Sequence, residues 1–381
     1  MEVGSEKSEV RNGRGRAGRA IVGPFLTSHF PLPTSAYREA GVDIDAGNEA
    51  LRRIRGQVRS TFGPQVLADV GHFGGLYALP GDGETVLVAS ADGVGTKLKL
   101  AFALDRHDTI GVDLVNHCVD DILACGARPL FFLDYFATGA LAPAQLEAVV
   151  AGLAAACRDN GCALLGGETA ELPGFYAPGE YDLAGFIVGQ VRRDAIVDGA
   201  AVREGDALLG LPSGGLHTNG YALARRALGL TGGPDEVRAA LTATPPGLDR
   251  PLGETLLAPH RSYLAPVGAL LEAGLVTGMA HVTGGGLVDN VARILPDGLG
   301  AAFDLDAWAA PPIFGLIRRW GEVDAAEMYR VFNMGLGFVV ACHPDDVAAC
   351  RERVPEALSV GKVVAAGPRE PRVRLAGLGR D

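Results

Sequence analysis

The stretch Thr85-Val-Leu-Val-Ala-Ser-Ala91 is a short apolar run, and Asp92-Gly-Val-Gly-Thr-Lys97 follows it directly. The run has the length and composition of a buried β-strand, which the two glycines end in a turn. Downstream, Pro143 to Asn160 has the apolar spacing of a helix and stops at Gly161. Strands and helices alternate in this way along the chain, which predicts an α/β (or α+β) fold with two domains.

Composition divides the chain into three parts. Residues 1–35 carry arginines among glycines and alanines without any helical or strand period, so we expect a disordered tail there. An N-terminal domain over residues 36–203 and a C-terminal domain over residues 204–381 follow. The N-terminal domain should open with a helix that Asp45 caps and that ends before Gly63-Pro64.

Charge and composition exclude several classes of partner. The net charge of −11 opposes binding to phosphate backbones, so we expect no nucleic-acid partner. The chain has no apolar run of membrane-spanning length and no signal peptide, so we expect no membrane partner. Its six cysteines form no CxxC pair, which indicates free thiols in a reducing compartment. We therefore expect a cytoplasmic protein.

The segment Asp92–Lys97 is the first candidate for chemistry. Its glycines let the backbone approach a phosphate closely, its N–H groups can bind phosphate oxygens, and Lys97 supplies a positive charge. Asp92 could bind Mg²⁺. The segment does not match the P-loop pattern GxxxxGK[ST]. A plain turn explains it equally well at this point.

An acidic stretch within residues 109–125 is the second candidate. Asp113 and Asp120 are seven positions apart and share one face of a helix, beside Asp121 and His117. Carboxylates among apolar neighbours are costly to bury without compensation, and Mg²⁺ with nucleotide phosphates can compensate them. A solvent-exposed face or a salt bridge is the alternative.

Three glycine-containing loops complete the set. Gly166-Gly-Glu-Thr-Ala-Glu171 brings two carboxylates to the end of an expected strand, where ligand sites of α/β sheets collect. Pro212-Ser-Gly-Gly-Leu-His-Thr-Asn-Gly-Tyr221 suits a phosphate monoester, and His217 is its candidate proton carrier. His281-Val-Thr-Gly-Gly-Gly286 leads into a helix. Structural turns, a hydrogen-bonding histidine and a linker are the respective alternatives.

No covalent nucleophile accompanies these loops. The chain contains no GxSxG, no zinc-type Cys/His cluster and no GxGxxG. The chemistry that remains is substrate positioning and charge neutralisation, as in phosphoryl transfer.

Several long motifs in order resemble the phosphoribosylformylglycinamidine cyclo-ligase family, also called AIR synthetase. The resemblance covers about residues 36–365. It rests on Tyr37-Arg-Glu-Ala-Gly-Val-Asp-Ile-Asp-Ala-Gly-Asn48, Asp92–Lys97, Asp121-Ile-Leu-Ala-Cys-Gly-Ala-Arg-Pro129, Phe131-Phe-Leu-Asp-Tyr135, Gly166–Glu171, His281–Gly286 and Met328-Tyr-Arg-Val-Phe-Asn333.

The resemblance implies a fold and a reaction. The fold would have an N-terminal domain that pairs in a homodimer around a β-barrel-like core, and a C-terminal α/β domain. The enzyme would convert formylglycinamidine ribonucleotide and ATP, with Mg²⁺, to 5-aminoimidazole ribonucleotide, ADP and phosphate, a step of purine biosynthesis. ATP would activate the formyl oxygen as a phosphate ester, and the amidine nitrogen would then attack that carbon and expel phosphate.

The resemblance also implies roles for individual residues. Asp92, Lys97 and His217 would be catalytic. The metal would bind Asp92 and Asp121, with Asp113 or Asp120 in support. ATP would bind Gly74, Gly75, Gly93, Gly95, Thr96 and Lys97. The phosphorylated ribonucleotide would bind Glu168, Thr169, Ser213, Gly214, His217, Thr218, Asn219, Thr283 and Gly284.

Two other interpretations stay open. One is another ATP-using relative, such as a selenophosphate synthetase or a thiamine-phosphate kinase. A selenophosphate synthetase usually has a reactive cysteine near its N-terminus, and no cysteine precedes Cys118 here. A thiamine-phosphate kinase lacks the sequence motifs found here at Asp121–Pro129 and Gly166–Glu171. The other is a degenerate partner subunit that only binds nucleotide, against which intact Asp92, Lys97 and Asp121 argue.

Overall fold

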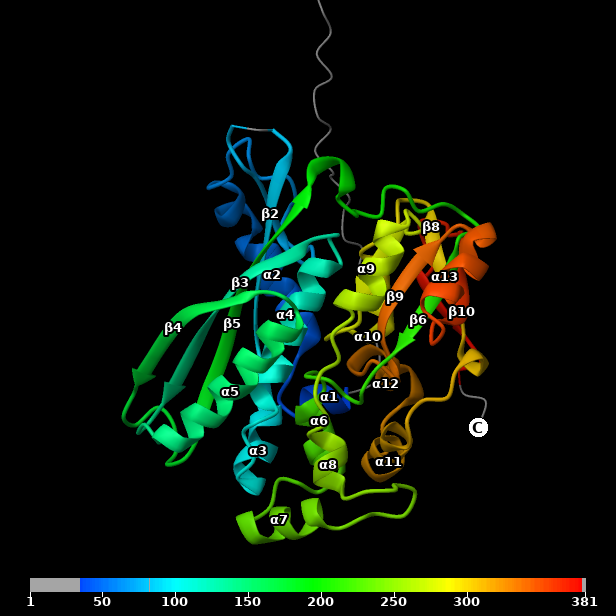
Figure 1. The fold of residues 1–381 in the computed structure, drawn as a ribbon. Coiled ribbons are helices and arrows are strands. Elements are labelled where there is room, and N and C mark those ends of the chain that lie inside the picture. The colour runs from blue at the N-terminus through cyan, green and yellow to red at the C-terminus, as the bar shows by residue number, and fades with distance from the viewer. Residues whose placement is uncertain (1–34, 82, 379–381) are drawn as a thin grey trace, which may run out of the picture.

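The computed structural model of the chain describes residues 35–81 and 83–378. Its strands form two sheets, one from strands within residues 75–192 and the other from strands within residues 207–376. Figure 1 shows the two sheets on opposite sides of the molecule, with helices between them. The mixed α/β class is therefore confirmed. The tail expected for residues 1–35 lies, apart from Ser35, outside the described residues.

The first sheet has five strands in the order β1-β2-β5-β3-β4. Neighbouring strands of this sheet are antiparallel, except that β3 and β4 run parallel because α5 carries the chain back between them. β4 is an edge strand, since it pairs with β3 alone. The bounds are β1 (Gly75–Ala78), β2 (Thr85–Gly93), β3 (Arg128–Thr138), β4 (Ala163–Glu171) and β5 (Tyr181–Arg192).

Helix α4 packs against one face of this sheet. In β5, Leu183, Ile187 and Val191 alternate toward that face and are buried, as a half-covered strand requires. The helices of this half and its short 3-10 turns are α1 (Ala36–Glu39), α2 (Ile44–Arg59), η1 (Gly95–Lys97), α3 (Leu98–Leu104), α4 (Ile110–Leu123), α5 (Pro143–Asp159) and η2 (Arg193–Ala195).

The expected cap of the first long helix is wrong by two residues. Asp43, not Asp45, is the N-cap of α2, and its side chain accepts a hydrogen bond from the backbone N–H of Ala46. Asp45 instead lies in the first turn, where a carboxylate also favours a helix, and it pairs with Arg330.

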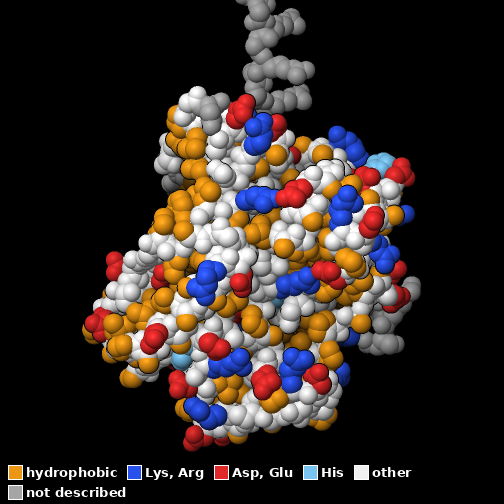
Figure 2. Space-filling model, in the orientation of Figure 1, with side chains coloured by type: hydrophobic (Ala, Val, Ile, Leu, Met, Phe, Trp, Pro, Cys, Tyr) orange, Lys and Arg blue, Asp and Glu red, His pale blue; other side chains and the backbone are white. Residues whose placement is uncertain are grey.

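The opposite face of the first sheet is apolar as well, and no helix of the described residues lies over it. Phe186 of β5 lies opposite Leu133 of β3, and Tyr77 of β1 lies opposite Leu87 of β2. Phe186 is 46% exposed and Leu165 of β4 is 63% exposed. Figure 2 shows hydrophobic side chains gathered along the border of the molecule where this sheet lies. Large aromatic and aliphatic side chains on such a face indicate a surface that another molecule covers.

The second sheet has six strands in the order β11-β8-β10-β6-β9-β7. Strand β9, which lies between β6 and the edge strand β7, is buried at every position, so both of its faces are covered. The strands are β6 (Ala207–Pro212), β7 (Gly278–His281), β8 (Leu299–Asp304), β9 (Leu336–Cys342), β10 (Leu358–Ala365) and β11 (Val373–Ala376). The helices and 3-10 turns are α6 (Tyr221–Ala227), α7 (Pro234–Thr242), α8 (Leu252–Leu256), α9 (Leu264–Glu272), α10 (Gly286–Ala292), η3 (Leu305–Ala307), α11 (Pro312–Gly321), α12 (Ala325–Val331), η4 (Pro344–Asp346) and α13 (Val347–Arg353).

Among the helices of residues 35–81 and 83–378, none combines the length and hydropathy needed to cross a membrane.

Candidate active site

The carboxylates of Asp92 and Asp121 converge on the imidazole of His117. Asp92 lies at the end of β2, and the other two residues lie on α4. His117 Nε2 is 2.6 Å from Asp92 Oδ2 and 4.0 Å from Asp121 Oδ2. Burial acts to lower the pKa of His117, but the Asp92 carboxylate outweighs it and raises that pKa to about 9. His117 is therefore a cation that compensates two carboxylates.

Asp92 is the member of this group that reaches solvent. Its side chain is 40% exposed, and its Oδ1 accepts a hydrogen bond of 2.7 Å from the N–H of Gly93. Burial acts to raise the pKa of Asp92, but His117 lowers it below its ordinary value. Asp121 is more enclosed: Ser90 Oγ donates to its Oδ2 at 3.0 Å, and His281 Nδ1 lies 2.8 Å from its Oδ1.

Lys97 is completely buried, and three oxygens surround its ammonium group. Nζ donates to Asp113 Oδ1 at 2.8 Å, to the Ala258 carbonyl at 2.8 Å and to the His217 carbonyl at 3.1 Å. These bonds use all three donors of an ammonium group. The predicted contact between Lys97 and an ATP phosphate does not fit this arrangement. Lys97 instead joins η1 and α4 to two loops of the second half of the chain.

Asp113 and Asp120 are likewise engaged with protein groups. Asp113 Oδ1 accepts from Lys97 and from the N–H of His260, and Asp120 Oδ1 accepts from the N–H of Tyr263 at 2.8 Å. Burial raises the pKa of both carboxyls, that of Asp120 by far more. A carboxyl group that is fully buried and already accepts hydrogen bonds from protein donors is a poor metal ligand. The geometry therefore argues against the predicted metal role of Asp113 and Asp120, and leaves that role to Asp92 and Asp121.

Four histidines gather between the two sheets: His117, His217, His260 and His281. The Nε2 atoms of His260 and His281 are 3.1 Å apart, and the ring of His217 stacks on that of His260 with centroids separated by 4.0 Å. Burial lowers the pKa of His217, His260 and His281, so these three rings are neutral and His117 carries the charge of the group.

His217 has a strained backbone and an unused ring nitrogen. Its φ of 62° lies in the left-handed region, which a non-glycine residue seldom adopts. Its Nε2 accepts a hydrogen bond from the N–H of Gly214 at 3.1 Å. Among the described residues, its Nδ1 has no hydrogen-bond partner. Because Nε2 accepts, the neutral ring carries its proton on Nδ1, and Nε2 is the only nitrogen of this buried side chain that could act as a base.

The other loop residues predicted to bind the ribonucleotide lie around this group. Thr218 Oγ1 is 2.5 Å from His117 Nδ1, and Gly284 lies against the side-chain oxygen of Asn219. Ser213 Oγ donates to the Gly215 carbonyl, beside Gly214, and to Asn333 Oδ1. Thr283 hydrogen-bonds Asn290 of α10. The loops at residues 212–221 and 281–286 therefore meet the end of β2.

The predicted ATP-binding glycines lie nearby on two segments. Gly93, Gly95 and Thr96 continue from Asp92 into η1, and Gly95 has a φ of +68°. Gly74 and Gly75 line a cavity of about 490 Å³ that extends to Ser90 and Ala91, next to Asp92.

Glu168 and Thr169 are not brought to this group. They lie on the edge strand β4, paired with Tyr135 and Phe136 of β3, and both are exposed. Two strands separate β4 from β2 in the sheet. Within one chain they therefore stand apart from Asp92.

Known proteins are similar to this chain over most of its length. The family model described as "AIR synthase related protein, N-terminal domain" matches residues 73–191, and that for the C-terminal domain matches residues 203–373. Phosphoribosylformylglycinamidine cyclo-ligase of Myxococcus xanthus is 53% identical over 337 residues, covering 87% of this chain and 96% of that protein. The protein of the same name from Gloeobacter violaceus is 54% identical over 340 residues, covering 87% and 99%.

The chain belongs to the AIR synthase family. Solved structures of more distant proteins share the fold. Thiamine-monophosphate kinase from Stenotrophomonas maltophilia has a TM-score of 0.53 at 20% identity, covering 86% of this chain and 96% of that one. Thiamine monophosphate kinase from Aquifex aeolicus has a TM-score of 0.54 at 15% identity, covering 88% and 98%.

Sequence reasoning missed part of this family site. It gave no role to His117, His260 or His281. The four-residue spacing from His117 to Asp121 was a usable signal, since it places both on one face of α4. His260 stands in no glycine motif, and only the folded chain brings it to His281.

Proposed function

We propose that this chain catalyses the ATP-dependent cyclisation of formylglycinamidine ribonucleotide to 5-aminoimidazole ribonucleotide, with release of ADP and phosphate. One observation carries the proposal: identity above 50% over nearly the full length of relatives with that activity in their name. The convergence of Asp92, Asp121 and the loops at residues 212–221 and 281–286 supports it, because these elements form one site between the two halves.

We propose that Asp92 and Asp121 hold Mg²⁺. Both carboxylates approach the same imidazole, His117, so the two acidic side chains lie close together, as ligands of one ion must. The solvent access of Asp92 suits Mg²⁺, which keeps part of its water shell. Bound Mg²⁺ would neutralise ATP phosphate oxygens during phosphoryl transfer.

His217 is the proposed base of the ring closure. When the amidine nitrogen forms its bond to the activated carbon and phosphate leaves, that nitrogen must lose a proton. In the neutral ring Nε2 accepts from the N–H of Gly214, so the ring proton lies on Nδ1 and only Nε2 can take up the proton. The substrate would have to displace the Gly214 N–H from Nε2 for this transfer.

We propose a homodimer joined through the open face of the first sheet. That face carries Phe186, Leu133 and Leu165, and no helix of the described chain covers it. Pairing of two such sheets would bury these side chains and form the barrel-like core that the family resemblance implies.

All six cysteines are free, which supports the cytoplasm as the compartment.

The test is incubation of the purified protein with formylglycinamidine ribonucleotide, ATP and Mg²⁺. We expect aminoimidazole, detected by its diazo colour, together with ADP and phosphate in equal amounts. Thiamine phosphate serves as the alternative acceptor. Phosphorylation of thiamine phosphate without aminoimidazole would favour the kinase interpretation, and ATP binding without either product would favour a nucleotide-binding subunit.

A further inference from the structure

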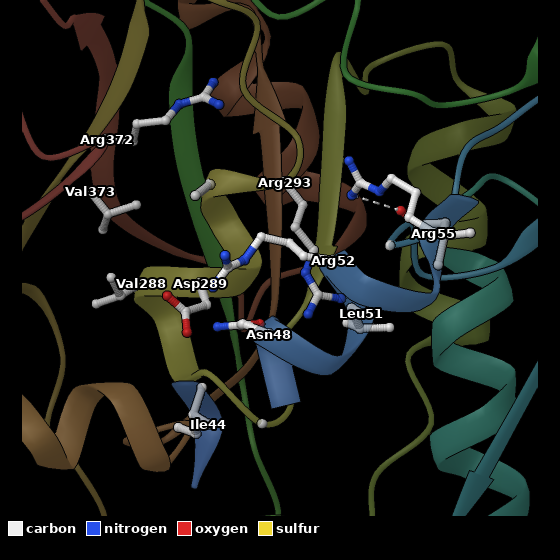
Figure 3. A pocket seen from close by; sticks show the side chains of 14 residues that line it. Ile44, Asn48, Leu51, Arg52, Arg55, Val288, Asp289, Arg293, Arg372 and Val373 are labelled. Atoms are coloured by element: carbon white, nitrogen blue, oxygen red, sulfur yellow. Dashed lines mark hydrogen bonds between the residues drawn. The ribbon is translucent and has the colours of Figure 1, made fainter. Parts of the chain in front are cut away.

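A second pocket, apart from the acid and histidine group, is lined by four arginines. It lies between α2 and α10, and Figure 3 shows Arg52 and Arg293 in its middle. Its volume is about 160 Å³. The charged side chains of its lining are Arg52, Arg55, Arg293, Arg372 and a single carboxylate, Asp289.

Three of these arginines already have polar partners. Arg52 pairs with Glu49 at 2.6 Å on the surface of α2. Arg55 donates to the Val70 carbonyl, and Arg372 donates to the Pro296 carbonyl at 2.8 Å. A carbonyl oxygen orients a guanidinium group without neutralising it, so the charge of Arg372 still acts on the pocket. Arg55 also faces a carboxylate, since its Nε lies 3.9 Å from Asp69 Oδ2.

Arg293 is the exception. Its guanidinium stacks over the ring of Phe73 at 5.1 Å, and among the described residues no hydrogen bond or ion pair to it is found. Burial lowers its pKa, and the carboxylates that act on it, Asp121 and Asp289, do so without direct contact. A largely enclosed guanidinium with unused N–H groups fits an oxyanion, which it can bind through two parallel bonds.

The single carboxylate of the pocket does not fill this role. Asp289 Oδ2 lies 3.7 Å from Arg330 Nε, on the side of α12. Burial raises the pKa of Asp289, while Arg330 and Arg293 act to lower it. The net charge of the lining is positive, and this favours an anionic ligand.

The pocket adjoins the candidate active site. Val70 and Gly71 line both this pocket and the larger cavity that reaches Ser90. Gly284, which contacts Asn219, also lines it. A ligand that extends from the Asp92 end of the cavity would place a terminal group near Arg293.

We infer that this pocket, with Arg293 at its centre, binds a phosphoryl group of one of the two phosphorylated substrates. This inference rests on the proposed function for the identity of those substrates. The ligand chemistry, a phosphate on an extended molecule, is common to the ribonucleotide and to ATP. The pocket has room for such a group.

The test compares Arg293→Gln and Arg293→Lys with the wild-type protein. For Arg293→Gln we expect the KM of one substrate, ribonucleotide or ATP, to rise about 10- to 100-fold, as loss of charge-assisted hydrogen bonds predicts. The KM of the other substrate should stay unchanged, and this identifies the source of the phosphoryl group. Arg293→Lys should give an intermediate KM, because an ammonium group keeps the charge but cannot make the two parallel hydrogen bonds of a guanidinium group.

A binding measurement separates this inference from the proposed function. Inorganic phosphate should bind the wild-type protein and bind Arg293→Gln at least about tenfold more weakly, as followed by calorimetry. Arg250→Gln, an exposed arginine that pairs with its neighbour Asp249, is the matched control and should bind like wild type. If the wild-type protein makes no aminoimidazole product, the proposed function fails while this comparison still tests the pocket.

The contrary outcomes are equally definite. Unchanged KM values for both substrates and unchanged phosphate affinity in Arg293→Gln would overturn the inference, as would a wild-type protein that binds no phosphate. If Arg293→Gln does not fold, as circular dichroism would show, Arg52→Gln on the exposed side of α2 takes its place under the same criteria.

Discussion

Two segments with the same local pattern have opposite surroundings in the fold. Asp92–Lys97 and Gly166–Glu171 each combine glycines, a threonine and acidic residues after an apolar run. The first contacts α4 and loops from the second half of the chain, and its Lys97 has no exposed surface although Gly95 and Thr96 are exposed. The second lies along the edge strand β4 and is exposed. Local pattern therefore predicts backbone freedom but not what the segment contacts.

The positions of the two strands explain the difference. β2 lies between β1 and β5, and α4 crosses its end, so residues that follow it meet the loop at residues 257–263. β4 has a neighbour on one side only. If Gly166–Glu171 has a function in the reaction, a second chain must bring it to the site of the first. The predictions below test the enclosed segment first and the exposed one last.

The largest expected effect is on the buried Lys97–Asp113 pair. Lys97→Met leaves the Asp113 carboxyl enclosed without its cation, and breaking such a pair costs about 3–5 kcal/mol of unfolding free energy. Urea denaturation measures it. Lys97→Met with Asp113→Asn should recover part of the loss, because the amide oxygen can still accept from the N–H of His260. If Lys97→Met has the stability of the wild-type protein, Lys97 does not stabilise the contact between the two halves of the chain.

Asp92→Asn should affect turnover more than stability. Asp92 is partly exposed and pairs with His117. Replacing its carboxylate with an amide should therefore remove a metal ligand and leave the fold intact. We expect kcat to fall more than about 100-fold, beyond the range seen for outer-shell changes at metal sites, with a raised Mg²⁺ requirement. Asp249→Asn, exposed and far from the group, is the matched control. Normal turnover in Asp92→Asn would remove this residue from the metal site.

The sequence predicts some elements of this fold and not the partners of its buried residues. The strand and the helix given by periodicity are confirmed, since β2 spans Thr85–Gly93 and α5 spans Pro143–Asp159. Periodicity is a weaker guide to β10, whose register shifts between Ser359 and Gly361 and so interrupts the alternation that marks a strand. The partners of Lys97 were not predictable, because the Ala258 carbonyl comes from 161 positions away.

The open sheet face should respond to a charge. Phe186→Asp would place a carboxylate in the middle of the proposed dimer interface and weaken dimerisation by at least about 100-fold, as a buried unpaired charge does. Light scattering after size-exclusion chromatography measures the change. Trp320→Asp, at an exposed aromatic of α11 in the other half of the chain, should leave the mass unaltered. A wild-type protein that is monomeric at all concentrations would refute this interface.

The smallest expected effect on stability comes from Glu168→Gln. Glu168 is exposed on β4, so the free energy of unfolding should change by no more than about 0.5 kcal/mol. Turnover nevertheless should fall if Glu168 acts in the site of the partner subunit. Mixing inactive Asp92→Asn with Glu168→Gln then rebuilds one intact site in each mixed dimer, and about one quarter of wild-type activity returns on random exchange of a twofold dimer. Full activity in Glu168→Gln alone would make the exposed segment structural, whereas loss of activity without recovery on mixing would place Glu168 in its own chain's site. The comparison of the two glycine segments therefore depends on whether Asp92 of one chain and Glu168 of the partner chain belong to the same active site.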